Sequence, residues 1–508
     1  MTDAPPRLEI RNLTKRFGSF TANDGISLTV RAGELHCLLG ENGAGKSTLS
    51  SCLFGLLQPE EGVVLVDGRA LSLWSPADAI AAGIGMVHQH FVLVPAFTVL
   101  ENIMVGTGRG LLADRKAARA RVAGICRSYG LALDPDRPVS QLSVGEKQWV
   151  EIVKSLYLGA RLLILDEPSA VLTPQESERL FVILRQLAAS GIAVILISHK
   201  MREVMQSDRV TVLRRGRKIA TVDTAGVTSD ELSEMMVGRR VRPVTAAAAA
   251  PVAPAAEPLL SVGGLRLALA RGRATAAIDL ELGRGEILGI AGIAGNGQDE
   301  LLETIAGLVP AEAGEIRLEG RPLSGLSAQA VAAMGVGYVP GDRFRDGLVP
   351  DFSIAENLIL GAQWQKALRR GPLIDAAAVQ ARGEAAIAGF AIAASGPVMR
   401  CARLSGGNAQ KVILAREFAK ARRLLLCNQP TRGVDVGATE FIHAELLRKR
   451  GEGCAILLVS EEIDDLLALS DRIAVMFGGG IAGLFRRDEA DVARIGRLMA
   501  GHGEGQAA

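Results

Sequence analysis

The sequence predicts an α/β protein that contains two similar domains. Three observations support this fold class. A glycine-rich loop lies between an apolar, strand-like run and a helix-like run, further short apolar runs are typical of parallel strands covered on both faces, and the same order of segments occurs again in the second half. With 508 residues, the chain is long enough for two domains that each bury a full core.

The composition excludes several classes of protein. The 57 Lys and Arg residues against 55 Asp and Glu residues give a net charge of +2, so no whole-chain basic surface points to nucleic acid. No uninterrupted apolar run reaches the roughly 18 residues of a membrane span, and the first six residues do not resemble a signal segment. The six cysteines are scattered, which predicts buried, reduced thiols in a cytosolic protein.

An Ala/Pro-rich stretch divides the chain nearly in half. Residues 243–258 lack the large side chains that a core needs and are predicted to form a solvated linker. The predicted first domain therefore covers residues 1–242, and the predicted second domain covers residues 259–508.

The two halves resemble each other in sequence. The run that ends at Gly40 aligns with the run that ends at Gly292, an offset of 252 residues (292 − 40). The segments Leu142–Glu146 and Leu404–Asn408 align at an offset of 262 (404 − 142), as do Asp166 and Asn428 (428 − 166). The second half is thus about ten residues longer between these points, and the pattern indicates a duplicated domain rather than a short-period solenoid.

The glycine-rich loop of the first half fits the phosphate-loop pattern G-x-x-x-x-G-K-[ST] and consists of Gly40, Glu41, Asn42, Gly43, Ala44, Gly45, Lys46, Ser47 and Thr48. A predicted strand (34–39) precedes it and a predicted helix (48–54) follows it. Backbone N–H groups of such a loop turn toward phosphate oxygens at the helix N-terminus. Lys46 would reach the β- and γ-phosphates, and the Ser47 hydroxyl would bind Mg²⁺.

Five motifs in the same order, found in both halves, resemble those of the nucleotide-binding domains of the ATP-binding cassette (ABC) family over nearly the whole chain. The resemblance implies two tandem P-loop ATPase domains, each with a parallel-sheet core, an antiparallel β subdomain and a helical subdomain. It also implies ATP hydrolysis with ATP and Mg²⁺ as cofactors. A helix predicted over residues 115–129 would belong to the first helical subdomain.

Two adjacent carboxylates, Asp166 and Glu167, end an apolar strand predicted over residues 161–166. Such a pair fits a role with a cation and a proton: Asp166 would hold Mg²⁺ through water, and Glu167 would orient or deprotonate the hydrolytic water. A pair that merely faces solvent is the alternative interpretation. The phosphate loop 120 residues upstream (166 − 46) favours the catalytic one.

Three further segments of the first half match family motifs. Phe17 lies where an aromatic residue stacks on adenine, although a core Phe is the alternative, and Gln89 matches the glutamine that contacts Mg²⁺ and the attacking water. His88 and His90 flank it, but no carboxylate or Cys joins them as a metal site. His199 follows a strand and matches the switch histidine at the γ-phosphate, in preference to a structural role.

The second half departs from the pattern at each catalytic position. A neutral amide does not neutralise phosphate charge, and an added carboxylate repels it. We therefore predict that this half does not hydrolyse ATP by itself. The replacements are Gln298 for the lysine, Asp299 for the serine, Asn428 and Gln429 for the acid pair, Glu461 for the histidine and Gly341 for the glutamine.

Signature segments remain in both halves, with Ser143 and Gly145 in the first and Ser405, Gly406 and Gly407 in the second. The Asp-loop is intact only in the second half, at residues 432–435, because Thr173 replaces its Asp in the first. Cassettes of this family pair head to tail, which implies one competent composite ATP site and one degenerate site. The competent site would bind ATP with Phe17, residues 40–48, Gln89, Asp166, Ser405, Gly406 and Gly407, bind Mg²⁺ with Ser47, Gln89 and Asp166, and catalyse with Lys46, Gln89, Glu167 and His199.

The second Asp-loop region, residues 430–438, resembles the ATP-binding subunits of importers for ribose, galactose and nucleosides. Residues 88–95, 167–176 and 429–433 lean toward the nucleoside group, whose solute-binding protein is often a basic-membrane-protein-type lipoprotein. The resemblance implies two integral-membrane permease subunits, an extracytoplasmic solute-binding protein, no nucleic acid, and a peripheral position on the cytoplasmic face of the inner membrane.

Three alternatives remain. A ribose/galactose-type sugar importer shares the same architecture. A soluble tandem cassette that acts on ribosomes usually has two acidic pairs and a long charged linker, both of which differ here. A DNA-repair cassette requires a long coiled-coil insert, which this sequence does not contain.

Overall fold

The computed structural model describes residues 6–71, 75–88, 91–105, 114–169, 172, 174–239, 257–269, 275–293 and 295–501. The chain divides into two compact units, Met1–Val241 and Arg242–Ala508, and each is described by itself. Of the predicted linker, only Glu257 and Pro258 lie within the described residues. The linker boundaries therefore stay a prediction.

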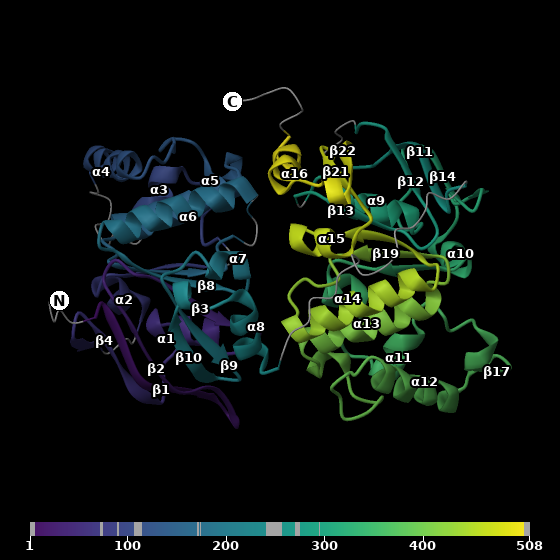
Figure 1. Ribbon diagram of the computed structural model, residues 1–508, viewed down its shortest axis with the longest axis horizontal. Helices are drawn as coiled ribbons and strands as arrows, with labels where there is room; N and C mark the ends of the chain where they lie inside the picture. Colours follow the sequence, from purple (N-terminus) through teal and green to yellow (C-terminus); the bar gives the residue numbers. More distant parts are fainter. Residues whose placement is uncertain are drawn as a thin grey trace. The chain divides into compact units, whose positions relative to one another are not determined.

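The first unit is built on a six-stranded sheet in the order β10-β9-β3-β8-β7-β6. Strands β3, β8, β9 and β10 of this sheet are labelled in Figure 1. All neighbouring strands are parallel except the edge pair β9–β10. The strands are β3 (Leu35–Gly40), β6 (Ile84–Val87), β7 (Leu162–Asp166), β8 (Ala193–Ser198), β9 (Arg209–Arg214) and β10 (Arg217–Asp223). The central strands are mostly apolar and are buried along their whole length, because both faces of the sheet are covered.

Two cores lie on opposite faces of this sheet, and successive residues of one strand alternate between them. On β7, Leu163 and Leu165 face one core, and Leu162 and Ile164 face the other. The first core is covered by α3 (Val99–Met104), α4 (Arg115–Ser128), α5 (Val144–Tyr157) and α6 (Pro174–Ala189). The second is covered by α1 (Lys46–Leu53), α2 (Pro76–Ala81) and an antiparallel sheet.

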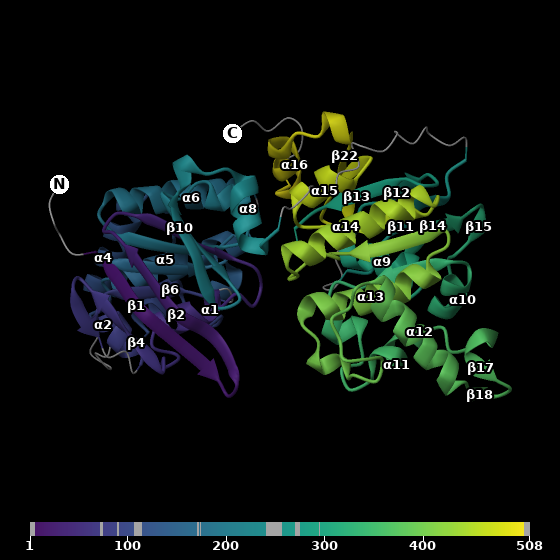
Figure 2. The same ribbon diagram turned by 60° about the horizontal axis from the view of Figure 1, so that its bottom comes forward.

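That antiparallel sheet has the order β2-β1-β4-β5. Its long strands β1 (Leu8–Phe17) and β2 (Phe20–Val30) run side by side (Figure 2), and β4 (Glu61–Val66) and β5 (Arg69–Leu71) complete it. The short helix α7 (Met201–Val204) lies between β8 and β9, and the unit ends with α8 (Ser229–Val237). The implied antiparallel and helical subdomains are thus both present.

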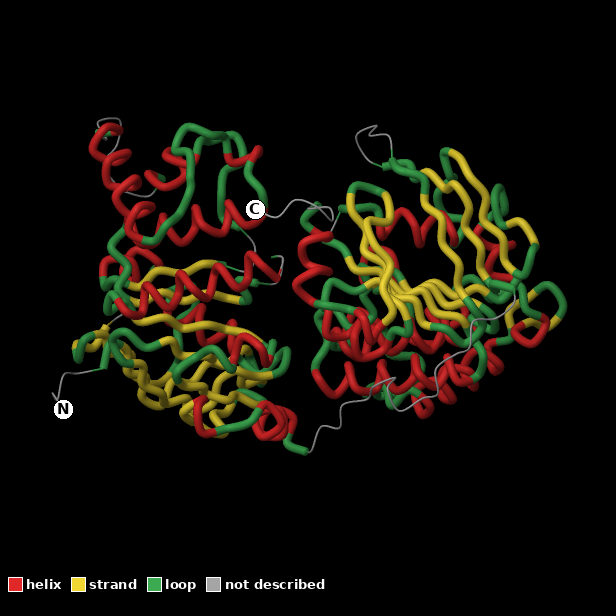
Figure 3. The backbone as a smooth tube through the Cα atoms, turned by 45° about the horizontal axis from the view of Figure 1, so that its top comes forward, coloured by secondary structure: helices red, strands yellow, loops and turns green. Residues whose placement is uncertain are grey.

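The second unit repeats this plan. Its six-stranded sheet has the order β16-β19-β20-β13-β21-β22, with β13 (Ile287–Ala291), β16 (Val336–Val339), β19 (Leu424–Asn428), β20 (Ala455–Val459), β21 (Arg472–Phe477) and β22 (Gly480–Arg486). Its antiparallel sheet contains β11 (Leu260–Arg266), β12 (Ile278–Leu282), β14 (Ala313–Leu318) and β15 (Arg321–Pro322). Figure 3 shows the strands and helices of each unit as separate layers.

The helices of the second unit also lie on two faces. One core is lined by α11 (Ile354–Ile359), α13 (Gly406–Lys420), α14 (Val436–Gly451), α15 (Ile463–Leu469) and α16 (Val492–Met499), and the other by α9 (Gln298–Ile305) and α10 (Ala328–Ala333). A hairpin of β17 (Arg369–Arg370) and β18 (Leu373–Ile374) precedes α12 (Ala376–Gly389). It lies in the interval in which the second half is longer.

These observations confirm the predicted α/β class with mixed parallel and antiparallel sheets. Within the part of the chain that the structure describes, no helix is both long enough and apolar enough to cross a membrane. All six cysteines are buried and free, as predicted. Burial raises the pKa of the Cys52 thiol to about 11, so this thiol stays protonated at neutral pH.

Candidate functional site

The phosphate loop of the first half lies between β3 and α1, in the strand–loop–helix context that the motif requires. The helix begins at Lys46, two residues earlier than predicted. The Lys46 side chain is 6% exposed, and its Nζ donates to the carbonyls of Gly40 (2.6 Å) and Glu41 (3.0 Å). Burial lowers the pKa of Lys46, and the carboxylates of Glu167 and Asp166 oppose that shift.

Gly45 lets the phosphate loop pack tightly against the antiparallel sheet. Its φ is +100°, and a Cβ there would lie 2.5 Å from the carbonyl oxygen of Ala22 and from Nδ2 of Asn23. Asn23 is fully buried and donates to the Gly45 carbonyl at 3.1 Å. The loop is thus held open in a curved form, with its helix N-terminus available for an anion.

Ser47 and Asp166 come together although they are far apart in sequence. Asp166 ends β7 and is 8% exposed, and the hydroxyl of Ser47, at the start of α1, hydrogen-bonds to its carboxylate. Burial raises the pKa of Asp166, and the neighbouring Glu167 adds to this effect, while Ser47 and Lys46 oppose it. A hydroxyl and a carboxylate at one point are oxygen ligands of the kind that Mg²⁺ prefers, so the residues present fit this cation.

Glu167 and His199 form a direct pair. Oε1 of Glu167 lies 2.9 Å from Nδ1 of His199, although the two residues follow different strands. The hydrogen bond with His199 lowers the pKa of Glu167, with burial acting in the opposite direction. Glu167 has a φ of +47°, which turns the chain sharply after the strand. The carboxylate is therefore ionised at neutral pH and held in one orientation.

Glu203, which no sequence motif marks, supports this pair through hydrogen bonds to neighbouring residues. Glu203 is 5% exposed on α7, and its carboxylate accepts hydrogen bonds from the hydroxyls of Ser198 (2.7 Å) and Ser169. Ser198 precedes His199, and Ser169 lies two residues after Glu167. One buried carboxylate thus joins the two loops that carry the catalytic pair, and no local pattern around Glu203 signals this role.

The remaining predicted residues of the first half are placed as follows. Phe17 is 48% exposed at the end of β1, which does not fit a core Phe, and Nζ of Lys15 lies 5.3 Å from its ring centroid. Gln89 and His90 lie outside the described residues. His88 packs edge-on against Phe54, and no group of three or more His, Cys, Asp or Glu side chains suited to a metal occurs among the residues described.

The equivalent loop of the second half folds in the same way with different chemistry. Gln298 is 4% exposed, and its Nε2 donates to the carbonyl of Ile293 at 3.1 Å, as Lys46 donates to Glu41 in the first half. Nδ2 of Asn428 donates to Oδ1 of Asp299 at 2.7 Å, which replaces the Ser47–Asp166 contact. The carboxylate has therefore moved from the strand end to the start of the helix.

The second half keeps the turn after its strand without the catalytic pair. Gln429 has a φ of +48°, within one degree of Glu167, and Glu461 occupies the position of His199. Gly341 leaves room for Asn428, because a Cβ there would lie 3.0 Å from Nδ2 of Asn428. A neutral amide therefore stands where the first half has the carboxylate base Glu167.

The two signature segments differ in charge at the N-terminus of the helix that follows. In the first half, Ser143 and Glu146 form a capping box at the start of α5, and Glu146 pairs with Arg137 at 2.6 Å. In the second half, Ser405 caps α13 and Asn408 takes the place of the glutamate. An anion at a helix N-terminus is favoured by the helix dipole, so the neutral second segment suits phosphate better.

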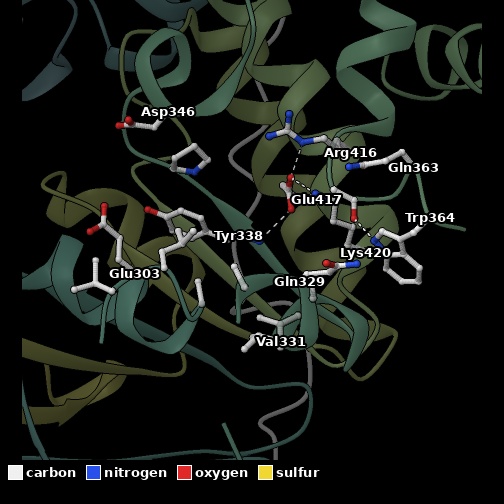
Figure 4. Close-up of a pocket in the computed structure, with 18 of the residues that line it drawn as sticks. Glu303, Gln329, Val331, Tyr338, Asp346, Gln363, Trp364, Arg416, Glu417 and Lys420 are labelled. Atoms are coloured by element: carbon white, nitrogen blue, oxygen red, sulfur yellow. Dashed lines mark hydrogen bonds and ion pairs between the residues drawn. The ribbon is translucent and has the colours of Figure 1, made fainter. Parts of the chain in front are cut away.

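A pocket of about 940 Å³ lies in the second half, between the end of β16, the β17–β18 hairpin and α13 (Figure 4). Its wall includes Tyr338, Trp364 and the buried Glu417, which pairs with Arg416 (2.6 Å) and Lys420 (3.0 Å). With Glu303, Asp346 and Arg369, the lining contains three carboxylates and three cations. The pocket is therefore a largely neutral hollow, separate from the loop that carries Gln298.

Comparison with known proteins gives consistent results. A sequence model described as ABC transporter matches residues 23–170 and 275–432. A nucleoside import ATP-binding protein of Lactococcus lactis subsp. cremoris is 43% identical over 97% of this chain and 98% of its own, and a guanosine import ATP-binding protein of Bacillus subtilis is 43% identical over 97% of each. A ribose import ATP-binding protein of Rubrobacter xylanophilus is 41% identical over 96% of this chain and 97% of its own.

Proposed function

The chain belongs to the ABC transporter family, and we propose that it is the ATP-hydrolysing subunit of an importer that takes up a nucleoside. ATPase domains of this family bind ATP. The observation that carries the proposal is the convergence of Lys46, Asp166, Glu167 and His199 in the first half. The second half contains amides or a glutamate at the same points.

We assign the residues of the first half the following roles. Residues 40–48 hold the phosphates, Phe17 supports the adenine, and Ser47, Asp166 and Gln89 would hold Mg²⁺, which supplies charge neutralisation when bound. Glu167 orients the attacking water and accepts its proton. His199 fixes the orientation of Glu167 through the 2.9 Å contact, and Glu203 holds both loops.

We further propose that Ser405, Gly406 and Gly407 complete this ATP site. The support is the pattern of motifs: the intact signature and Asp-loop occur in the second half, and the intact catalytic residues occur in the first. The neutral N-terminus of α13 agrees with this assignment, because a γ-phosphate placed there meets no carboxylate at the Asn408 position.

Relatives that import nucleosides and relatives that import ribose both align over nearly the whole chain, and their identities differ by only two percentage points (43 − 41). The segments 88–95, 167–176 and 429–433 support the nucleoside assignment, and a simple sugar is the second candidate. We propose two integral-membrane permease subunits and an extracytoplasmic solute-binding protein as partners. The chain would then lie on the cytoplasmic face of the inner membrane.

The ATPase assignment is tested with Glu167→Gln. We expect ATP turnover to fall by about 10²- to 10⁴-fold while ATP binding persists, because the amide keeps the shape but accepts no proton. Gln429→Glu is the matched control in the second half and should leave turnover unchanged. Near-normal turnover in Glu167→Gln would refute the assignment.

The solute is tested by uptake in cells that lack the chain and are complemented with it. Labelled guanosine and labelled ribose are compared, each with wild type and with Lys46→Ala. Guanosine uptake that requires Lys46 supports the nucleoside proposal. Uptake of ribose alone would replace it with the sugar alternative.

A further inference from the structure

A rare π-helix follows the end of β16 in the second half, at Arg343–Gly347. Asp342 caps it by accepting hydrogen bonds from the backbone N–H groups of Phe344 and Arg345, both at 3.0 Å. Gly347 packs it onto α13, since a Cβ there would lie 2.6 Å from Cδ1 of Ile413. Single π-turns are frequent at functional sites, and this one is anchored to the helix that begins with the signature segment.

Arg343 extends from this turn to two other loops. Its Nη1 donates to the carbonyl of Gly406, the first residue of α13, and its Nη2 donates to the carbonyl of Gly433 in the Asp-loop, each at 3.2 Å. A guanidinium is planar, always charged and able to donate in two directions at once. One side chain therefore ties the signature segment and the Asp-loop together.

The two loops are shaped to receive this side chain. Gly433 has a φ of +64°, and a Cβ there would lie 2.5 Å from Nη2 of Arg343. A Cβ on Gly406 would lie 3.2 Å from Nη1 and 3.3 Å from the Gly433 carbonyl. At both points a larger residue would displace the guanidinium. The contact thus depends on an arginine and two glycines as a set.

The first half contains none of the three. By the offsets of 252 and 262 residues, Phe91 stands where Arg343 does, and Val144 and Val171 stand where Gly406 and Gly433 do. The set occurs in the half whose signature and Asp-loop are intact, which links it to those motifs. A purely structural clamp of the fold would be needed equally in both halves.

We propose that Arg343 is a positioning residue for ATP hydrolysis, which holds the signature segment and the Asp-loop of the second half in the geometry that the ATP of the first half requires. This inference rests on the proposed function. The N–H groups at the start of α13 aim at a phosphate only if the first turn is fixed, and small misplacements of positioning groups reduce turnover strongly. Charge-assisted bonds to two carbonyls supply that constraint.

The test compares Arg343→Ala, Arg343→Lys and the control Arg345→Ala in the full chain. Arg345 lies in the same π-helix, carries the same charge, is exposed, and its Nε donates to Asp346 at 3.2 Å. Hydrogen exchange of backbone amides is measured over residues 404–408 and 432–435, together with ATP turnover. Turnover is measured in the purified chain or, if the chain turns over ATP only with its membrane subunits, in that complex.

We expect Arg343→Ala to accelerate exchange in both segments and to lower kcat by about tenfold or more, with the KM for ATP within about twofold. Arg343→Lys should fall between wild type and alanine, because lysine keeps the charge but lacks the planar fork that directs two N–H donors to carbonyls on different loops. Arg345→Ala should match wild type in every measurement.

Exchange in Arg343→Ala equal to that in Arg345→Ala would overturn the inference. So would faster exchange with unchanged kcat, because the clamp would then have no role in hydrolysis. Failure of the proposed function is seen separately, as normal turnover in Glu167→Gln. The two failures are thus distinguished by different variants.

Discussion

The two halves of this chain share one backbone plan and differ in the chemistry placed on it. Lys46 and Gln298 both donate to a carbonyl of their own loop, yet only the first is a cation. Glu167 and Gln429 have φ values of +47° and +48°, yet only the first is a carboxylate. The left-handed turn therefore belongs to the strand–loop junction of the fold and is not by itself a mark of catalysis.

The signature segments show the opposite distribution. A carboxylate of Glu146 lies in the first turn of α5, and Glu176 lies against Gly145, since a Cβ there would be 2.4 Å from its Oε1. At the start of α13 the corresponding positions are Asn408 and Ala438, and a guanidinium is added. Each half has thus kept the features suited to phosphate that the other has lost, which is the asymmetry expected for one competent site.

The largest effect should come from Lys46, compared with Gln298 at the equivalent position of the second half. Lys46→Ala should abolish stabilisation of the chain by Mg-ATP in a thermal-shift assay and lower turnover by about 10³-fold, because the cation that meets the β- and γ-phosphates is lost. Gln298→Ala is the matched variant and should change turnover by less than about twofold. Stabilisation by ATP that survives in Lys46→Ala would show that the second half also binds nucleotide strongly.

The next largest loss of turnover should come from His199, which follows β8, compared with Glu461, which follows β20. His199→Ala should lower turnover by about 10²-fold with ATP binding retained, because Glu167 loses the contact that orients it. Glu461→Ala, at the equivalent position, should leave turnover unchanged. The comparison is made by steady-state kinetics, and equal losses in both variants would contradict the asymmetry.

Much of this asymmetry was predictable from sequence because it lies in contiguous motifs. The duplicated order, the phosphate loop and the acid pair predicted the fold class, and the structure confirms that class. The contact between Ser47 and Asp166 was also predictable, since both were expected to meet the same cation. Residues within one motif carry their own signal, whatever the distance along the chain to their partner.

Other features could not be predicted because they depend on contacts between segments that have no motif. Glu203, on α7, accepts hydrogen bonds from Ser169 and Ser198, which belong to two different segments of the chain. The hydrogen bond from Asn428 to Asp299 spans 129 residues. The sequence alone predicted only that Asn428 removes a carboxylate and that Asp299 repels phosphate. The Arg343 contacts join residues 63 and 90 positions apart and end on backbone carbonyls. Every residue has such a carbonyl, so the sequence does not indicate which ones are contacted.

Exchanging the equivalent residues Asn408 and Glu146 of the two signature helices should have a smaller effect on turnover. Asn408→Glu should lower turnover by about tenfold, because a carboxylate in the first turn of α13 competes with phosphate for the helix dipole. The helix itself should persist, since Ser405 with a glutamate three residues later forms a capping box. Glu146→Asn in the first half removes the ion pair with Arg137 and should leave turnover within about twofold of wild type. A similar loss of turnover in both variants would mean that both signature segments serve hydrolysis.

The smallest effect should appear in stability, with opposite signs in the two halves. Burial raises the pKa of Asp166 above its unfolded value, so its ionisation in the folded state costs stability above the folded pKa, and this cost disappears as pH falls below the unfolded pKa. Asp166→Asn should therefore stabilise the nucleotide-free chain by about 1 kcal/mol at neutral pH, with no gain in acid, while hydrolysis is lost.

Asn428→Asp reverses the experiment in the second half. It replaces the 2.7 Å hydrogen bond to Asp299 with two adjacent carboxylates, and it should destabilise the chain by about 1 kcal/mol at neutral pH and less in acid, where one carboxylate binds a proton. Urea unfolding at several pH values measures both variants, and Asp299→Ser in the Asn428→Asp background should remove the penalty. If the two variants changed stability with the same sign, the exchange of carboxylate and neutral partner between the halves would not be the feature that sets local stability there.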